Sequence, residues 1–399
     1  MAARHTAART SVVGLVAAAL AVTAFAVPAQ AADARGGDAR GAKHAATQRA
    51  MDEVVKAGIP GMLAGVSDRN GVWKSTSGVG NLATNAPRGV NDKFRIASIT
   101  KPMVATVLLQ LEQEKRIDLD DTVEKWLPGL VRGNGNDGRK ITIRQLLNHT
   151  SGIYNYTSAP AFYLHYLHPP TFPVQRFATH RPETLVKFAV AHPPTFAPGA
   201  GQQYSNTGYV LAGMVIKKVT GNSHGKEIHE RVVKPLGLRN TVFPDADPKM
   251  PKPSGRAYTR LFHPLLKPLD ATQHNMTWLA AAGDGISNSE DLNRFFSALL
   301  KGRLLTKSSL AAMKTTPPVP PGTPYDGYGL GIFTFRTSCG VKLWGHTGGT
   351  PGSQSEAVTT DDGSHSVTNN RNGDWVDIAP VTEAAYCGKP GGTRRLPVL

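Results

Sequence analysis

Residues 94–101 have the sequence Phe94-Arg95-Ile96-Ala97-Ser98-Ile99-Thr100-Lys101, in which an extended approach passes into a helix. The helix is indicated by apolar residues at helical spacing, namely Met103, Val104, Val107, Leu108 and Leu111. Pro102 is compatible with it, because the amides of the first turn lack intrahelical partners. The pattern therefore predicts an S-x-x-K step at a helix N-terminus.

This step brings together a nucleophile and a base. Residues three apart share a helix face, so the Lys101 amine is expected to meet the Ser98 hydroxyl. The helix N-terminus also stabilises negative charge that develops nearby. The chemistry is that of an acyl-enzyme. Taken alone, however, the four residues favour a plainer interpretation, with Ser98 as an N-cap and Lys101 in solvent.

A second candidate segment, Tyr204-Ser205-Asn206, precedes a predicted helix. In an extended step Tyr204 and Asn206 point the same way. A phenol can relay or accept a proton, and an amide can hydrogen-bond a substrate carbonyl. The alternative is a helix capped by Ser205 or Asn206, with Tyr204 in the packing.

The third segment is Trp344-Gly345-His346-Thr347-Gly348-Gly349, at the end of a predicted strand. Its glycines would let a substrate approach the backbone closely. Alone it reads as a strand ending in a turn. The order S-x-x-K, Y-x-N, H-T-G along one chain is far more specific than any single piece.

The N-terminus carries the features of a secretory signal. Arg4 and Arg9 precede an apolar run over residues 12–27, and Ala29-Gln30-Ala31 provides a cleavage site. We expect a signal peptide at 1–31, a flexible leader at 32–44 and a secreted protein. No other segment approaches the length of a membrane span.

The formal net charge is +16, with the positive residues scattered along the chain. We expect at most an affinity for anionic envelope polymers, and no nucleic-acid partner. His229-Glu230 is not continued to H-E-x-x-H, so neither a metal nor another cofactor is expected. The two cysteines, Cys339 and Cys387, are expected to form a disulfide in an exported chain, worth about 4 kcal/mol. The alternative is two buried thiols.

Both ends of the chain predict strands and a helix, whereas the middle predicts helices. Asn70-Gly71 between two β-prone runs indicates a hairpin. Strands are expected at 328–335 and 341–344, and a helix bent at Pro380 over 376–386. The simplest arrangement is an α/β (α+β) fold. Its antiparallel sheet domain takes in residues 45–130 and 318–399, and an all-helical domain is inserted at 131–317.

With these three motifs the chain resembles the serine penicillin-recognising hydrolases. They include class C β-lactamases, β-lactamase-like esterases and, with the strongest resemblance, the secreted serine D-alanyl-D-alanine carboxypeptidases of actinobacteria. The resemblance extends to Leu146-Leu147-Asn148-His149-Thr150-Ser151-Gly152 and Tyr328-Gly329-Leu330-Gly331. It implies a β-lactamase/transpeptidase-like fold, a disulfide between the two cysteines, a small peptide or ester substrate, and β-lactams as covalent inhibitors. We expect a monomer.

Residue by residue, the resemblance implies that Ser98 is acylated and that Lys101 and Tyr204 handle its proton, with the choice of base left open. Asn206 would hold the substrate, and the amides of Ser98 and Gly349 would form the oxyanion hole. The side chains of His346 and Thr347, with Gly348 beside them, would line the substrate's carboxylate side. Trp278 and Phe162 resemble aromatic walls of the cleft, although either is also suited to the core.

Two departures bear on the substrate. The carboxypeptidases have a threonine after H-T-G and an arginine on the preceding strand, where this chain has Gly349 and Phe333. These departures leave fewer donors for a substrate carboxylate and count against a carboxypeptidase. Carboxypeptidase activity is still expected from the resemblance, with an esterase, amidase or β-lactamase as the alternative. The remote alternative is a non-catalytic envelope-binding protein.

A competing motif, Gly221-Asn222-Ser223-His224-Gly225, matches the G-x-S-x-G nucleophile elbow. An elbow requires a strand before it, whereas the residues here recur at helical spacing and Gly221 suits a helix C-terminus. We therefore expect Ser98, and not Ser223, to be the nucleophile.

Overall fold

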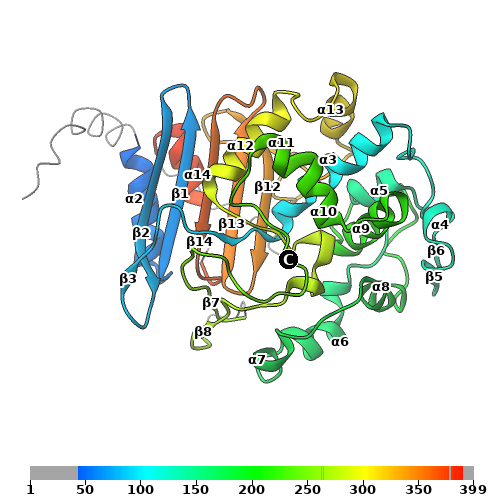
Figure 1. Cartoon of the computed structure of the whole chain (residues 1–399), viewed down its shortest axis with the longest axis horizontal. Helices are drawn as coiled ribbons and strands as arrows, with labels where there is room; N and C mark the ends of the chain where they lie inside the picture. Colours follow the sequence, from blue (N-terminus) through cyan, green and yellow to red (C-terminus); the bar gives the residue numbers. More distant parts are fainter. Residues whose placement is uncertain (1–43, 262, 264, 377–378, 390–399) are drawn as a thin grey trace, which may run out of the picture.

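The computed structural model describes residues 44–261, 263, 265–376 and 379–389 (Figure 1). The predicted signal peptide and the leader up to residue 43 lie outside the described residues. None of the helices in the described ranges is long and apolar enough to cross a bilayer.

An eight-stranded antiparallel sheet forms one side of the molecule (Figure 1). Its strands, in spatial order, are β10 (Gly327–Tyr328), β11 (Phe333–Arg336), β12 (Lys342–Thr350), β13 (Ser353–Thr360), β14 (Ser366–Arg371), β1 (Gly61–Asp68), β2 (Gly71–Asn81) and β3 (Ala86–Pro87). The predicted hairpin is confirmed, since Asp68 of β1 pairs with Gly71 of β2. The two ends of the chain meet where β1 pairs with β14.

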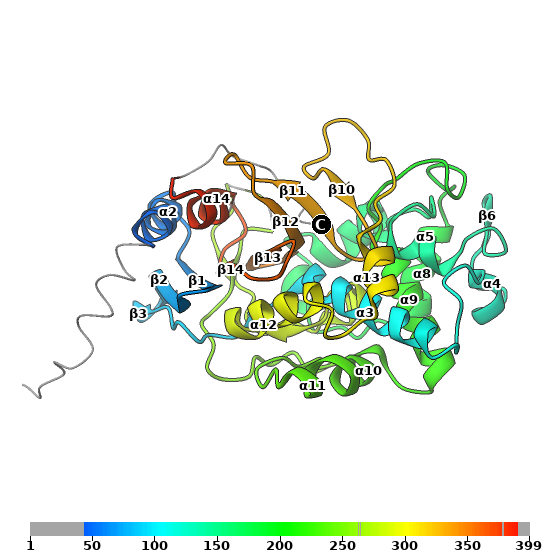
Figure 2. The same ribbon diagram turned by 90° about the horizontal axis from the view of Figure 1, so that it is seen from above.

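Helices cover both faces of this sheet (Figure 2). On one face lie α2 (Ala45–Lys56) and α14 (Ala379–Cys387), and on the other lies α12 (Ser289–Leu300). Met62 and Ala64 of β1 pack in the cluster with α2 and α14, whereas Leu63 packs in the cluster that includes α12. A strand covered on both sides needs apolar residues at successive positions, which is why β1 is buried without alternation.

The rest of the chain is mainly helical and packs beside the sheet (Figure 1). Its α-helices are α3 (Thr100–Gln113), α4 (Val123–Trp126), α5 (Ile143–Leu147), α6 (Pro160–Phe162), α7 (Phe172–Gln175), α8 (Pro182–Val190), α9 (Asn206–Thr220), α10 (His224–Ile228), α11 (Lys234–Leu236) and α13 (Lys307–Lys314). Single 3-10 or π turns are η1 (Ala97–Ile99), η2 (Tyr156–Ser158), η3 (Tyr163–Leu167), η4 (His229–Val233), η5 (Met276–Trp278) and η6 (Ala280–Ala282). Short strand pairs are β4 (Phe94–Arg95) with β9 (Ile286–Ser287), β5 (Arg132–Gly133) with β6 (Asn136–Asp137), and β7 (Tyr258–Thr259) with β8 (Leu269–Asp270).

The boundary between sheet and helices does not follow the predicted ranges. Helix α12 falls within 131–317, yet it packs on the sheet, where Asn293 Nδ2 donates to Gly65 O at 3.0 Å. One continuous hydrophobic cluster also joins α3, α9 and α12 to residues of β1 and β12. The division into two domains therefore stays a prediction.

Three local expectations have clear outcomes. Cys339 and Cys387 form a disulfide, which ties the turn after β11 to the end of α14. Gly221 ends α9 in the left-handed region, with φ 80°, as the sequence indicated. The predicted C-terminal helix is present as α14 (Ala379–Cys387), with Pro380 in its first turn, where proline is accepted; residues 377–378 lie outside the described residues, so the bend at Pro380 stays a prediction.

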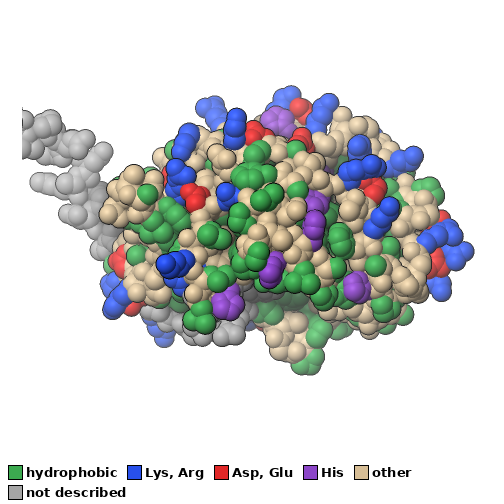
Figure 3. Space-filling view, turned by 90° about the horizontal axis from the view of Figure 1, so that it is seen from below, with side chains coloured by type: hydrophobic (Ala, Val, Ile, Leu, Met, Phe, Trp, Pro, Cys, Tyr) green, Lys and Arg blue, Asp and Glu red, His purple; other side chains and the backbone are tan. Residues whose placement is uncertain are grey.

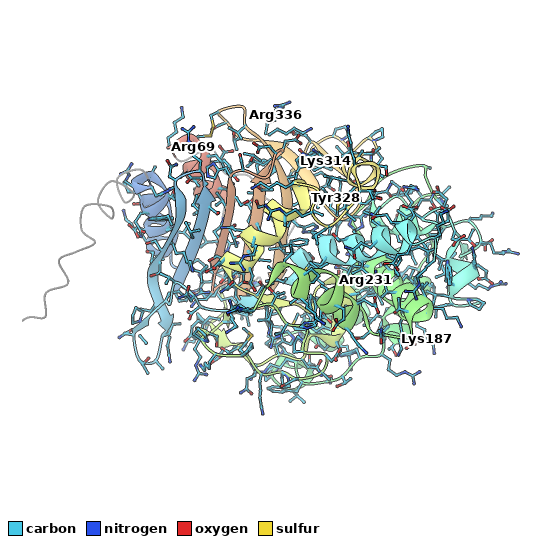
Figure 4. All side chains as sticks on the ribbon, turned by 45° about the horizontal axis from the view of Figure 1, so that its top comes forward. Arg69, Lys187, Arg231, Lys314, Tyr328 and Arg336 are labelled. Carbon is cyan, nitrogen blue, oxygen red and sulfur yellow. A yellow bond between two sulfur atoms is a disulfide. The ribbon has the colours of Figure 1, made fainter. Side chains whose placement is uncertain are left out.

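Positive charge is dispersed over the surface. In Figure 3 the Lys and Arg side chains lie around the edge of the face, with hydrophobic side chains and single histidines between them. Arg69, Lys187 and Arg336 lie at the periphery, whereas Tyr328 lies inside, where the sheet meets the helices (Figure 4).

Candidate active site

Ser98 lies in the tight turn η1, between the extended β4 and helix α3. Its predecessor Ala97 is fully buried and adopts φ 45°, in the left-handed region that costs a residue with a Cβ atom about 1 kcal/mol or more. The turn is held from outside, since the Ile96 amide donates to Gly285 O at 3.0 Å. The fold thus imposes a strained turn that leaves Ser98 8% exposed.

Strand β12 passes directly beside this turn. β11 pairs with β12 only as far as Gly345, so residues 346–350 extend beyond that pairing and lie against η1. A Cβ atom on Gly348 would lie 2.0 Å from Ile96 O. The glycine of the H-T-G motif is therefore required for strand-to-turn packing, in addition to the predicted access for a substrate.

Lys101 lies one turn after Ser98 and is completely buried. Its Nζ atom lies 2.7 Å from Ser98 Oγ, 2.8 Å from Asn206 Oδ1 and 2.7 Å from Ala282 O. All three of these partners are uncharged. Burial therefore holds the pKa of the Lys101 amine well below its usual range.

Asn206 begins α9 and is also fully buried. Its amide Oδ1 faces Lys101, while Nδ2 donates to Thr157 Oγ1 at 3.2 Å, which fixes the orientation of the side chain. Asn206 was expected to hold the substrate. In the structure its Oδ1 atom also contacts Lys101 Nζ, so Asn206 helps to orient the lysine side chain.

Tyr204 precedes α9 and is partly exposed. Lys101 Nζ lies 4.9 Å from the centre of its ring. Burial raises the pKa of the Tyr204 phenol, and a hydrogen bond with Ser98 opposes that rise only in part. The structure thus pairs an amine that readily loses its proton with a phenol that keeps it.

His346 on β12 is 2% exposed, and both of its ring nitrogens are engaged. Nδ1 faces the Thr347 carbonyl, which can only accept, so Nδ1 carries the hydrogen. Nε2 is then free to accept from the Tyr328 hydroxyl at 2.9 Å. Burial is the largest cause that lowers the pKa of His346, to about 3. A neutral imidazole bonded in this way offers no positive charge to a substrate carboxylate.

The two departures noted in the sequence lie next to His346. Phe333 pairs with Gly345 across the strands, and its ring centre lies 5.4 Å from that of His346. The phenylalanine is buried and stacks on Tyr325. Gly349 lies opposite Gln354 of β13, beside the largely buried Thr347.

The expectation that Trp278 and Phe162 wall the cleft is corrected by the structure. Their exposed fractions are 0% and 1%, and their ring centres lie 6.0 Å apart in the main hydrophobic cluster. Both rings are surrounded by other aromatic side chains and serve the core.

Three contributors were missed by sequence reasoning. They are Thr157, which holds Asn206, the Ala282 carbonyl, which holds Lys101, and His149. The His149 ring packs 4.3 Å from that of Tyr204, and its Nδ1 accepts from the Ser205 amide at 3.2 Å. His149 stood in a segment that carried the family resemblance, which was the available signal. A backbone carbonyl leaves no such signal.

The competing elbow motif takes no part in this site. Ser223 caps α10 by accepting from the Lys226 amide at 3.2 Å, and helix α9, not a strand, precedes it. Within the described ranges, no group of three or more His, Cys, Asp or Glu side chains is placed to hold a metal ion.

The antiparallel sheet, with a buried serine–lysine pair at the helix beside its edge, defines a serine hydrolase of the β-lactamase/transpeptidase fold. The family model described as Beta-lactamase matches residues 44–365, and the chain belongs to this family. The resemblance to serine penicillin-recognising hydrolases and the predicted fold class are confirmed.

Among solved structures, a D-stereospecific amidohydrolase from Streptomyces sp. is 51% identical with a TM-score of 0.83, over 87% of this chain and 99% of that one. Penicillin-binding protein 4* of Bacillus subtilis is 27% identical over 70% of this chain. Esterase EstB of Burkholderia gladioli is 33% identical over 45%. The chain spans 61% and 45% of the length of these two curated relatives.

Proposed function

We propose that this protein is a secreted amidohydrolase that cleaves amides or esters of D-configured acyl groups through an acyl-enzyme on Ser98. The observation that carries the proposal is the hydrogen bond between Ser98 and a buried Lys101 whose partners are all neutral. Export is proposed from the signal-like sequence of residues 1–31.

In the acylation step, neutral Lys101 removes the proton of Ser98 as Oγ bonds to the substrate carbonyl carbon. The amides of Ser98 and Gly349 hold the oxyanion, a contribution of about 3 kcal/mol per donor. The bond to the leaving amine or alcohol then breaks, and the proton passes from Lys101 through the Tyr204 phenol to the leaving group. Water attacks the ester next, and the same groups return a proton to Ser98.

The substrate class follows from the strand beside the nucleophile. A carboxypeptidase must bind a terminal carboxylate, which usually calls for a cation. Here His346 is neutral with both nitrogens engaged, and Phe333 replaces the arginine of the carboxypeptidases. These features favour an acyl donor without that carboxylate, and the Streptomyces amidohydrolase supports D-stereospecificity. D-alanyl-D-alanine carboxypeptidase activity stays a prediction.

The test compares purified protein on four substrates: D-phenylalanine amide, L-phenylalanine amide, a p-nitrophenyl ester, and a peptide ending in D-Ala-D-Ala. We expect release of ammonia from the D-amide, hydrolysis of the ester and little release of D-alanine. Faster cleavage of the peptide than of the D-amide would favour the carboxypeptidase.

The nucleophile is tested separately by intact mass and peptide mapping after treatment with a penicillin or an activated ester. The adduct is expected on Ser98 and absent in Ser98→Ala. Ser223→Ala is the matched control, because it removes the other candidate serine and leaves the acylation site untouched. A label on Ser223, or a protein that is never labelled, would contradict the proposal and favour a non-catalytic binding protein.

A further inference from the structure

A cavity whose lining does not include Ser98 lies among α8, α9, α10 and the turn η6. Its volume is about 200 Å³. Its apolar lining includes Val210 and Met214 of α9 and Ala281 of η6. Gly213 lets α9 pack closely on η6 in this wall, since a Cβ atom on it would lie 2.4 Å from the Ala281 Cβ.

The polar part of the lining includes a buried carboxylate with unused capacity. Asp284 has a side chain only 3% exposed, and its Oδ2 bonds to His224 Nε2 at 2.7 Å. Its other oxygen, Oδ1, is buried without a hydrogen-bond partner among the described residues. A carboxylate has about four acceptor sites, and leaving one oxygen without a partner costs roughly 1–3 kcal/mol.

Two further polar groups border the same space. The Nε2 atom of His180 is also buried without a partner in the described part of the chain. Asp245 adds a second carboxylate and is itself exposed, as is Lys217 at the rim. The cavity thus combines an apolar wall with a carboxylate oxygen that lacks a donor.

We propose that this cavity binds a small organic cation, a primary ammonium on an apolar body, with the ammonium group on Asp284 Oδ1. An ammonium has three donors and a positive charge, which match an unpaired carboxylate oxygen. The hydrocarbon part gains by removing the surfaces of Val210 and Met214 from water.

Other uses of the same residues fit less well. Within the described ranges no side-chain group is suited to a metal ion. The adjacent Ser223 is occupied as the cap of α10, and His224 directs Nε2 to Asp284, so these residues do not form a second serine hydrolase site.

The inner wall of the cavity belongs to the catalytic framework. Ala280 and Ala281 line the cavity, while Ala282 in the same turn accepts from Lys101 Nζ. A ligand on Asp284 would therefore lie behind the turn that holds the proposed base, in a cavity whose lining does not include Ser98.

The probe is benzylammonium, with benzyl alcohol as its neutral analogue, measured by calorimetric titration and saturation-transfer NMR on the whole protein. Charge on neighbouring groups matters: burial would lower the pKa of His224, but Asp284, with Asp245, raises it overall. The titrations are therefore run at a series of alkaline pH values, because a protonated His224 would compete with the ligand for Asp284; Arg95 and Lys217 are the other cations near the two carboxylates. We expect one bound benzylammonium per chain and much weaker binding of the alcohol.

Two variants test whether benzylammonium binds in this cavity. Asp284→Asn keeps an acceptor for His224 but removes the charge, and Met214→Phe narrows the cavity without touching Asp284. Each should weaken benzylammonium binding about tenfold or more, equivalent to about 1.4 kcal/mol. Asp52→Asn, on α2 across the sheet, is the matched control and should bind as the parent does. Equal binding of alcohol and ammonium, unchanged affinity in both cavity variants, or no binding to the parent would each overturn the proposal.

Discussion

The Nζ atom of Lys101 lies 2.7 Å from the Oγ atom of Ser98, inside a site where its other acceptors are an amide oxygen and a backbone carbonyl. A buried ammonium usually has a carboxylate beside it. Because these partners are neutral, the deprotonated amine is favoured, and in that form Nζ can accept the proton of the Ser98 hydroxyl. This arrangement favours Lys101, and not Tyr204, as the base that first removes the Ser98 proton.

Replacing Lys101 by methionine should nearly abolish acylation. The variant keeps an unbranched side chain, one atom shorter, but has no basic atom to take the proton, and a positioned base typically contributes 10²–10⁴-fold. The rate of penicillin or ester labelling is the measurement. Lys125→Met, at an exposed lysine paired with Asp121, is the matched control. Labelling of Lys101→Met at the parent rate would exclude Lys101 as the base.

The pH dependence of kcat/KM should reflect the lowered pKa of Lys101. Burial lowers the pKa of Lys101, so its active neutral form persists at pH values far below the 10.4 of a free lysine. Values of kcat/KM are therefore expected to fall as the pH drops through that lowered pKa and to be level above it. A profile that keeps rising towards the pKa of an ordinary lysine would mean that Lys101 is charged at neutral pH.

Tyr204→Phe should impair amides more than activated esters. The raised pKa of the phenol keeps its proton available for the leaving group. An amine must be protonated to leave, whereas p-nitrophenolate leaves without a proton. We expect a loss of about 10²-fold or more on the amide and a smaller loss on the ester. Equal losses on both would indicate that Tyr204 acts on Ser98 alone.

The fold and the main site residues could be predicted because their signals are local. The S-x-x-K step, the Asn70-Gly71 hairpin and the Gly221 helix end each depend on neighbours a few residues away. The sheet followed from strands at both ends of the chain. Alternation, however, could not assign the faces of β1, since α2, α14 and α12 cover both of them.

What escaped prediction depends on contacts between distant segments. Ala282 acts through a backbone carbonyl 181 positions from Lys101, and such an atom has no residue type. Aromatic residues such as Phe162 and Trp278 are equally suited to a cleft wall and to a hydrophobic core. Only their packing against each other in the structure shows that they belong to the core. The place of α12 on the sheet is set by Asn293 and Gly65, 228 positions apart.

Gly348→Ala should damage both stability and activity. The new Cβ atom would lie 2.0 Å from Ile96 O, so β12 and the turn that carries Ser98 must separate. We expect a lower melting temperature and a large fall in kcat. Gly138→Ala is the control, since its Cβ would meet its nearest neighbours at an ordinary 3.4 Å. A fully active Gly348→Ala would show that the strand can shift without moving the nucleophile.

His346 should make the folded state sensitive to acid. Burial is the largest cause that lowers its pKa from 6.5 to about 3, so the unfolded chain binds a proton more readily throughout that interval. The associated stability is complete above pH 6.5 and is lost as the pH falls towards 3, by up to about 5 kcal/mol. His346→Gln removes this contribution, so its free energy of unfolding should vary less steeply with pH over that range, even though the variant loses the bond from Tyr328. His229→Gln, at an exposed position on η4, should keep the parent slope. Denaturant unfolding at a series of pH values measures the free energy of unfolding. If that free energy varies equally steeply with pH in His346→Gln and in the parent, His346 is already charged in the folded protein.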